Sequence, residues 1–270
     1  MSEKFLHRSE APFSDKVWQA IDEAVVEAAK TQLTARRLLS IEGPYGLGLK
    51  AIPGPDVPVD EKGAAGAVVS ASSMIPVALL QSSFTLAARD IAAFEGTGLP
   101  LPLKSAADAA IACARQEDAL VLYGSGRLGV EGLLTAKGTK SLKLKAWKEV
   151  GAAVEDLIQA VTKLDEAGFH GPYALALEPS RYNLLFRRYP QGNQTEIEHV
   201  RTLVAGGVVK APGIASGGVL LATGRQFATI VLGQDLMTRF VGPAGEGYEF
   251  LTMESLALRL LEPSSVCVFQ

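Results

Sequence analysis

The sequence predicts an α+β fold, in which helices and strands are mixed without the regular alternation of a parallel α/β sheet. Long segments carry apolar residues at the spacing of an amphipathic helix, and the C-terminal third contains short apolar runs typical of strands. With 270 residues, of which 48% are hydrophobic and 20% charged, the chain can bury a sizeable core and is not a disordered protein.

The first predicted helix starts after Ser14, because a serine there can accept hydrogen bonds from the free N–H groups of the first turn. Phe13 and Trp18 occupy the two positions of a hydrophobic staple. Apolar residues then recur at helical spacing as far as Leu33 and form one stripe that must be covered. We expect the two arginines at 36–37 to close this helix.

An arm of two short strands is predicted next, over Leu47–Ile52 and Ala67–Ser73, joined by a segment rich in proline and glycine. An isolated two-stranded ribbon is marginal in water. We therefore expect the arm to lie on its own domain or on a neighbouring subunit, and an ordinary surface excursion is the alternative.

A long helix is predicted over Ser105–Tyr123. Ser105 and Asp108 have the spacing of a capping box, and no glycine, proline or asparagine interrupts the alanine-rich run that follows. Gly124 stands where a glycine is expected to end the helix.

Gly124, Gly126 and Gly129 also match the G-x-G-x-x-G spacing of a dinucleotide-binding loop. That loop requires a strand before it and a helix that opens at its third glycine, whereas a predicted helix comes before it here. An NAD-binding oxidoreductase is therefore disfavoured. We predict instead that these glycines let the chain leave a long helix and reverse sharply.

Other patterns for catalysis or metal binding are weak. Ser125 does not lie in the G-x-S-x-G frame of a nucleophile elbow, and the three histidines are dispersed. Glu196 and His199 form one Glu-x-x-His pair, whereas a di-iron centre needs two such pairs and further carboxylates. We expect no catalytic residue and no metal site.

The later elements follow from the same patterns. Trp147–Ala167 is predicted as an amphipathic helix that ends at Gly168, with Ile158 among its inward-facing residues. The other predicted elements are strands over Tyr173–Leu177, Val219–Thr223, Phe227–Leu232, Tyr248–Leu260 and Val266–Phe269, and helices over Pro179–Arg187 and Thr195–Ala205.

Composition excludes several classes of protein. The net charge of −3 gives no general attraction to nucleic acid or to anionic membranes. No apolar stretch approaches the roughly 20 residues that span a bilayer. Two cysteines form no disulfide framework, and the N-terminus lacks the apolar core of a signal peptide. We expect a cytoplasmic protein that binds neither nucleic acid nor membrane.

Sequence motifs are spread over nearly the whole chain. They are Phe5–Arg8, Trp18 with Ile21-Asp22, Arg36-Arg37, Ile41–Gly46, Phe84–Leu86, Gln116–Asp118, Gly129–Leu134, Gly171–Tyr173 and Leu232–Leu236. In their order and spacing these blocks resemble encapsulin shell proteins of the first family, also known as the linocin-type proteins.

The resemblance implies the phage-capsid fold known as HK97, with an added N-terminal helix that lines the shell interior. In such a fold the helix ending at Tyr123 is the spine helix. The implied division is an N-terminal arm and helix over 1–46, an extended loop over 47–75, a peripheral domain over 76–134 and 226–270, and an axial domain over 135–225.

The implied function is that of a shell protein and not of an enzyme. Such chains form a homo-oligomeric icosahedral shell, here expected to contain about sixty subunits because the chain is short. The shell packages a cargo enzyme, typically a ferritin-like iron oxidase or a dye-decolourising peroxidase, through a C-terminal targeting peptide. A phage major capsid protein is the alternative, although it would be expected to carry a scaffolding segment in place of the N-terminal helix.

The resemblance places a cargo-peptide groove between the N-terminal helix and the strands of the peripheral domain. Relatives carry a larger aromatic residue and an acid where this chain has Ala29 and Ser40, which implies a wider groove with a weaker charge contact. The candidate groove residues are Ala29, Leu33, Arg36 and Ser40 on the helix side and Asp235 and Met237 on the strand side.

A polar loop between two predicted helices is suited to line a five-fold pore if the protein forms a ring of subunits. Its residues are Arg187, Arg188, Tyr189, Pro190, Gln191, Gly192 and Asn193.

Some members of the family hold a flavin stacked on a tryptophan just after the Phe-Thr-Leu block. Arg89 stands at that position here and offers no such ring, so we expect no flavin and no other cofactor.

Overall fold

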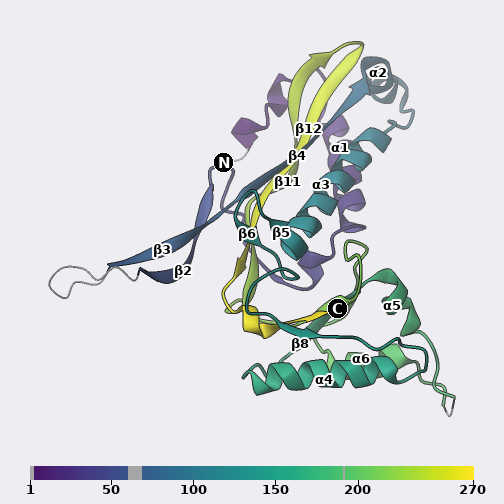
Figure 1. Cartoon of the computed structure of the whole chain (residues 1–270). Helices are drawn as coiled ribbons and strands as arrows, with labels where there is room; N and C mark the ends of the chain where they lie inside the picture. The colour runs from purple at the N-terminus through teal and green to yellow at the C-terminus, as the bar shows by residue number, and fades with distance from the viewer. Residues whose placement is uncertain (1–2, 60–68, 191) are drawn as a thin grey trace.

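The computed structural model describes residues 3–59, 69–190 and 192–270. They form an elongated body with a sheet in each half, and a two-stranded arm projects from its side (Figure 1). The upper half in Figure 1 holds the long C-terminal strands, and the lower half holds the helices of the segment between residues 150 and 204. The chain ends in the sheet of the lower half.

The upper sheet has the strand order β1-β11-β12-β4 within the described residues. Strands β11 (Ala228–Ala244) and β12 (Gly247–Leu260) form a long antiparallel hairpin. Strand β4 (Ala78–Ala87) pairs antiparallel with β12, and β1 (Ser40–Glu42) pairs parallel with β11. This sheet therefore joins segments from both ends of the chain.

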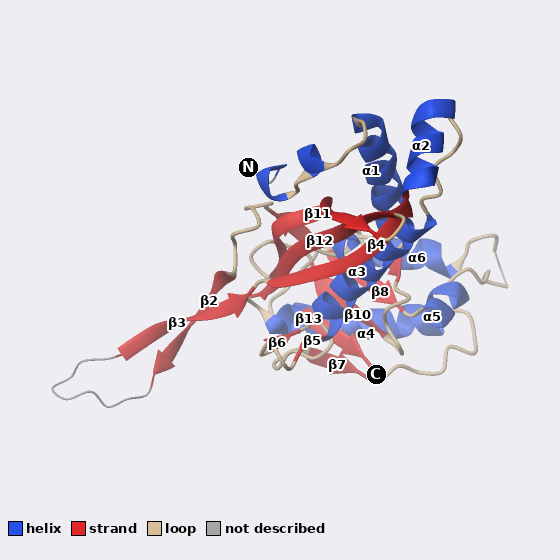
Figure 2. Cartoon of the chain, turned by 90° about the horizontal axis from the view of Figure 1, so that it is seen from above, coloured by secondary structure: helices blue, strands red, loops and turns tan. Residues whose placement is uncertain are grey.

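Helices α1 (Asp15–Lys30) and α3 (Lys104–Tyr123) pack against each other and against this sheet, and α2 (Ala88–Thr97) directly follows β4 (Figures 1 and 2). The predicted staple is present, because the ring centroids of Phe13 and Trp18 are 5.5 Å apart. Both rings also contact the aromatic ring of Phe250 in β12, so the staple is continuous with the core of the upper half.

The lower sheet has the order β7-β13-β10-β8-β9 within the described residues, and its two central neighbours β10 and β8 are buried along their whole length. The strands are β7 (Lys140–Leu142), β8 (Tyr173–Leu177), β9 (Val208–Lys210), β10 (Gly218–Ala222) and β13 (Val266–Phe269). The helices of this half are α4 (Ala152–Glu166), α5 (Pro179–Leu184) and α6 (Glu196–Leu203).

The arm consists of β2 (Ala51–Val59) and β3 (Val69–Pro76) and points away from the body in both views (Figures 1 and 2). The predicted position of its first strand is wrong, because β2 continues through Pro53-Gly54-Pro55. The pairing register shifts between Pro53 and Asp56. This irregularity lets the ribbon include prolines, which have no N–H group to donate to the neighbouring strand. Residues 67–68 of the second predicted strand lie outside the described residues.

The start of α3 differs from the predicted capping box. The hydroxyl of Ser105 donates to the carbonyl of Thr85 at 3.0 Å, and the carboxylate of Asp108 pairs with Lys104. The helix begins at Lys104 instead, so the serine links α3 to the end of β4 and does not cap its own helix.

The end of α3 agrees with the prediction. The helix stops at Tyr123, and Gly124 follows with a φ of +70°. The chain then forms the short hairpin of β5 (Gly124–Ser125) and β6 (Val130–Glu131). A helix therefore precedes the glycine motif, and no helix follows it, which contradicts a dinucleotide-binding loop.

Two other predicted helices are shorter than expected. Helix α1 ends at Lys30, and the arginines at 36–37 lie in a separate turn, η3 (Ala35–Arg37). Helix α4 begins only at Ala152. Trp147 therefore lies before the helix, and its indole N–H donates to Asp156 inside it at 2.8 Å. The inward orientation predicted for Ile158 is wrong, since this residue is 48% exposed.

Strand β11 extends well beyond its predicted end at Leu232. The pairing with β12 shifts register between Leu232 and Gln234 and again between Gln234 and Met237. The residues from Ala228 to Gln234 are all buried without alternation, and the bulges that follow carry the polar residues Gln234 and Asp235, so the apolar signal for a strand stops at Leu232. The bulges also displace Asp235 and its neighbours from regular pairing.

We predict that Gly124→Ala lowers the free energy of unfolding by about 1–3 kcal/mol, because the residue has a left-handed φ and an added Cβ would meet the carbonyl oxygen of Val130 at 2.4 Å. Gly126→Ala is the matched control, since nothing lies within 4 Å of its added Cβ. Denaturant unfolding of both variants tests this, and equal losses of stability would contradict it.

Candidate functional sites

The first candidate site is a cluster of one cation and three carboxylates where α3 packs on the upper sheet. The guanidinium of Arg36 donates from Nε and Nη2 to Glu117 at 2.8 and 2.7 Å, and from Nη2 to Glu254 at 2.9 Å. Its Nη1 donates to Asp235 at 2.8 Å. The side chains of Glu117 and Glu254 are 0% and 1% exposed, whereas that of Asp235 is 50% exposed. Arg36 thus joins η3, α3, β11 and β12.

The backbone of the turn that carries Arg36 is fixed by the neighbouring acid of α3. The backbone N–H groups of Thr34 and Ala35 donate to the carboxylate of Asp118 at 2.9 to 3.0 Å. Burial raises the pKa of Asp118 above its ordinary value, although these backbone hydrogen bonds oppose the shift. Two consecutive acids of α3 therefore hold the side chain and the backbone of the same turn.

The electrostatics of the cluster depend on burial and on the unequal number of charges. Burial alone would lower the pKa of Arg36, but the hydrogen bonds and charge of Glu117, and then those of Asp235, outweigh it and raise that pKa. Burial, and next the charge of Glu117, raise the pKa of Glu254 to about 9. The guanidinium therefore stays charged, and the pKa of Glu254 lies well above that of an ordinary glutamate.

The structure brings together part of the predicted peptide groove and separates the rest. Arg36 and Asp235 are in direct contact, as described above. Ala29 is only 3% exposed and belongs to the core beneath α1, and Leu33 packs against the same core. Ser40 lies in β1 opposite Thr229 of β11, and Met237 lines a different hollow.

That hollow is a groove of about 790 Å³ between the N-terminal turns, the polar face of α1 and Met237 of β11. Arg8 spans it with two hydrogen bonds of 2.7 Å to Asp22, and its guanidinium lies 4.5 Å from the ring centroid of Trp18. Arg8 and Asp22 were not among the predicted groove residues. Both residues lie in motifs that carry the family resemblance, and these motifs were the sequence signal that could have indicated the groove.

The second candidate site is the loop predicted to line a pore, and its first residue is a structural anchor. The guanidinium of Arg187 donates to the backbone carbonyls of Trp147 and Lys148 at 2.8 and 3.0 Å. It also forms an ion pair with the buried Glu196 at 3.3 Å. Glu196 accepts the backbone N–H groups at the start of α4 at 2.9 and 3.1 Å. Arg187 therefore fixes the beginning of the loop to the beginning of α4.

The rest of the described loop is more open. Arg188, Pro190, Gly192 and Asn193 are exposed, and Gln191 lies outside the described residues. The ring of Tyr189 packs on that of His199 with centroids 4.8 Å apart. One exposed basic residue and one stacked aromatic ring therefore precede the polar tip.

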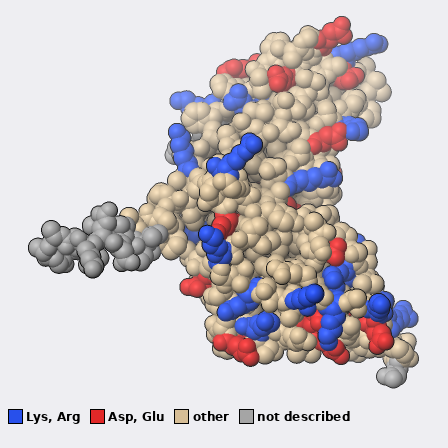
Figure 3. Space-filling view, in the orientation of Figure 1, with Lys and Arg blue, Asp and Glu red and all other residues tan. Residues whose placement is uncertain are grey.

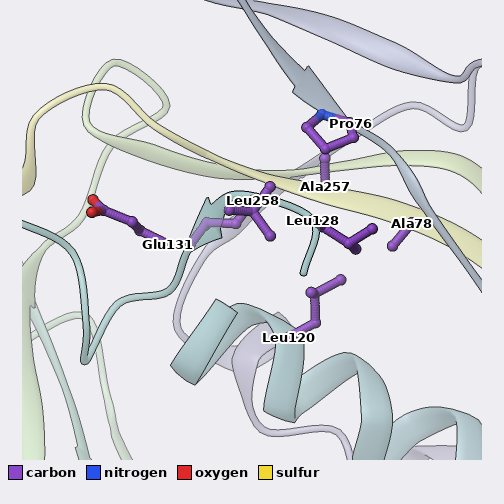
Figure 4. Close-up of a pocket in the computed structure, with 8 residues that line it drawn as sticks. Pro76, Ala78, Leu120, Leu128, Glu131, Ala257 and Leu258 are labelled. Atoms are coloured by element: carbon purple, nitrogen blue, oxygen red, sulfur yellow. The ribbon is translucent and has the colours of Figure 1, made fainter. Parts of the chain in front are cut away.

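A metal-ligand cluster or a small cavity is the remaining kind of feature that could form a site. The described residues contain no group of three or more histidine, cysteine or acidic side chains that could hold a metal ion. The cavity between α3, the β5–β6 hairpin and the base of the arm is about 10 Å³, which is room for about one water molecule (Figure 4). Arg89 is exposed at the start of α2.

The surface also lacks a dominant charge of one sign on the face that Figure 3 presents. Basic side chains gather over the lower half of the body, where acidic side chains are interleaved with them. Across the described residues, no helix is both long and apolar enough to cross a bilayer.

Comparison with known proteins gives the family. A family model described as "Encapsulating protein for peroxidase" matches residues 3–257. The type 1 encapsulin shell protein EncA of Myxococcus xanthus is 33% identical over 276 residues, which cover 98% of this chain and 96% of that protein. This chain belongs to the encapsulin shell protein family.

Two other encapsulin relatives are fusion proteins. A diheme-cytochrome–encapsulin shell fusion protein of Kuenenia stuttgartiensis is 30% identical over 97% of this chain and 75% of its own length. A ferritin-like–encapsulin shell fusion protein of Pyrococcus furiosus is 26% identical over 59% of this chain and 46% of its own length.

Solved structures confirm the HK97 type of fold. A virus-like particle from Pyrococcus furiosus superposes with a TM-score of 0.73 at 22% identity, covering 94% of this chain and 99% of that one. The capsid of the phage XM1 superposes with a TM-score of 0.61 at 13% identity, covering 85% and 88%. The mixed helix and sheet architecture predicted from the sequence is thus that of viral capsids and encapsulins.

We predict that Arg187→Ala lowers the free energy of unfolding by about 2–4 kcal/mol, because it leaves Glu196 buried without its cation and removes hydrogen bonds to two carbonyl groups. Arg188→Ala is the control, since Arg188 is exposed one residue along the same loop. Thermal or denaturant unfolding measures both. A loss of similar size in the control would show that the loop residues are equivalent.

Proposed function

We propose that this encapsulin chain assembles into a closed icosahedral shell of about sixty copies that packages a cargo enzyme. The observation that carries the proposal is the match to encapsulin shell proteins over almost the full length of the chain. The chain has the role of a container in this proposal, and the chemistry belongs to the cargo. We place the assembled shell in the cytoplasm.

The arm supports assembly on physical grounds. A two-stranded ribbon that projects into solvent buries little apolar surface and is marginal by itself. Met74 in β3 is 60% exposed, and Leu79, where the arm joins the body, is 49% exposed. A neighbouring copy that covered these side chains would stabilise the ribbon, as expected for the extended loop over 47–75 in an HK97-type shell. The axial domain proposed for residues 135–225 would then meet its copies through the lower half of the body.

The proposed cargo is an enzyme of the ferritin-like or dye-decolourising peroxidase type that carries a C-terminal targeting peptide. Fusion of encapsulin relatives to a cytochrome or a ferritin-like protein supports an association with redox proteins. We propose that the peptide binds at the exposed edge of the Arg36 cluster, where Asp235 is half exposed, and extends toward Met237 in the neighbouring groove. Leu33 and Ser40 would flank it. Ala29 is buried, so in this proposal it would support the groove from the core and would not touch the peptide.

We also propose that the loop over 188–193 lines an opening at the five-fold axis, through which small molecules or ions pass to the cargo. The exposure of Arg188, Pro190, Gly192 and Asn193 supports this role. Arg187 serves as the root of the loop in this proposal, because its side chain is occupied by backbone carbonyls of the segment before α4.

The proposal predicts that the purified protein forms round hollow particles in negative-stain images. Native mass spectrometry should give a mass of about 1.7 MDa, sixty times the 28.5 kDa of one chain. Mass spectrometry of co-purified proteins should identify a single enzyme with a conserved C-terminal tail. A small dimer or tetramer would contradict the shell, and a shell without cargo in its native host would favour the capsid alternative.

We predict that Asp235→Lys reduces the amount of co-purified cargo several-fold and leaves shell assembly intact, because it reverses the charge of the half-exposed acid beside Arg36. Glu149→Lys makes the same charge change at an exposed position of the lower half and is the matched control. The ratio of cargo to shell protein, measured by quantitative mass spectrometry, tests the difference. An unchanged ratio in Asp235→Lys would place the peptide elsewhere.

A further inference from the structure

Two acids of the Arg36 cluster share a feature that the shell function does not explain. Glu117 of α3 and Glu254 of β12 are both fully buried, and each places an Oε2 atom on the same Nη2 atom of Arg36, at 2.7 and 2.9 Å. The two carboxyl groups therefore meet at one nitrogen, with one guanidinium between them. The third acid, Asp235, takes the opposite nitrogen and is half exposed to solvent.

The charges of this cluster do not balance if every acid is ionised. Arg36 supplies one positive charge against three carboxylates, and solvent screens only Asp235 effectively. A second negative charge in the buried part would then lack a partner, and buried ions without partners are strongly disfavoured relative to their neutral forms. A carboxyl group in this position holds its proton and remains neutral.

An unsatisfied buried atom of Glu254 agrees with a neutral carboxyl group. Among the described residues, no donor reaches Oε1 of Glu254, although this atom is buried. The Oε2 atom of Glu254 accepts from Nη2 of Arg36, which also donates to Glu117, so the two carboxyl groups are neighbours on one nitrogen. Two ionised carboxylates can only accept hydrogen bonds, so a direct bond between these neighbours would require a proton on one of them.

We propose that Glu117 and Glu254 share one proton at neutral pH, and that this proton joins α3 to β12 beneath Arg36. Loss of the proton in alkaline solution leaves two like charges in contact and weakens the packing of the helix on the sheet. This proton contributes to the stability of the subunit itself, whatever the cargo or the size of the shell.

The surroundings of the pair favour the neutral form. On the β4 side, the residue opposite Glu254 is the apolar Leu80. Burial and the charge of Glu117 raise the pKa of Glu254 to about 9, against the opposing effect of Arg36. The other titratable or charged groups that face the pair are Cys113 and Asp118 of α3, Arg36 of η3 and Asp235 of β11.

The direction of the pH dependence follows from this shift. The folded chain holds a proton on the pair that the unfolded chain releases above about pH 4.5, the ordinary pKa of a glutamate. The stabilising contribution is therefore complete below that pH and is lost progressively as the pH rises to about 9, where the folded pair also ionises. Within this window the folding equilibrium constant falls by up to about tenfold for each pH unit through this pair.

The test compares the full-length protein with Glu254→Gln, which keeps the shape and cannot ionise. The urea midpoint of the parent should fall more steeply than that of the variant between about pH 6 and about pH 9. Asp156→Asn is the control, because Asp156 is also buried but accepts N–H groups from Trp147 and Lys145 at 2.8 Å. Its difference from the parent should stay constant over this range.

Infrared spectroscopy in D₂O gives a second readout that does not depend on stability. The parent should show the C=O stretch of one protonated carboxyl group at neutral pH, and Glu254→Gln should lack it. If Glu254→Gln does not fold, Glu117→Gln serves instead, since its amide can donate to Glu254. Parallel pH profiles, or the absence of a protonated carboxyl band in the parent, would overturn the proposal.

Discussion

The guanidinium of Arg36 is the contact on which the upper half of the molecule depends. It binds acidic side chains from three elements that are distant in sequence, and two of these side chains, Glu117 and Glu254, are fully buried. The turn that carries Arg36 is itself held by Asp118. Glu117 and Asp118 of α3 therefore hold the helix against the sheet and also fix the turn that follows α1.

Local signals in the sequence predicted the elements whose ends are set by local chemistry. The staple of Phe13 and Trp18 and the helix end at Gly124 depend on residues close in sequence, and both were predicted correctly. The capping box at Ser105 was wrong, because Thr85, distant in sequence, offers a competing carbonyl group. Strand β11 was predicted too short because its apolar run ends at Leu232, and the bulges that follow bring polar residues into the strand.

In the candidate sites, too, some residues could be predicted from the sequence and others depend on contacts between distant segments. Resemblance to the family selected Arg36 and Asp235, and the structure places them in contact. It could not reveal that Ala29 faces the core, or that Glu117 and Glu254 meet, because such pairing depends on how α3 crosses the sheet. A glutamate in the middle of the predicted strand over Tyr248–Leu260 was the visible signal, since a buried acid needs a partner.

The hydrogen bonds of Arg187 affect which residues of the loop can be substituted without loss of stability. The root of the loop is fastened to the segment before α4 and to Glu196, whereas the next residue, Arg188, is already exposed. Substitutions at the exposed positions Arg188, Pro190, Gly192 and Asn193 therefore alter the chemistry of the loop at little cost to folding. The polarity and charge of the loop can thus change at these exposed positions, whereas Tyr189 is held by its contact with His199 and Arg187 by its hydrogen bonds to the segment before α4.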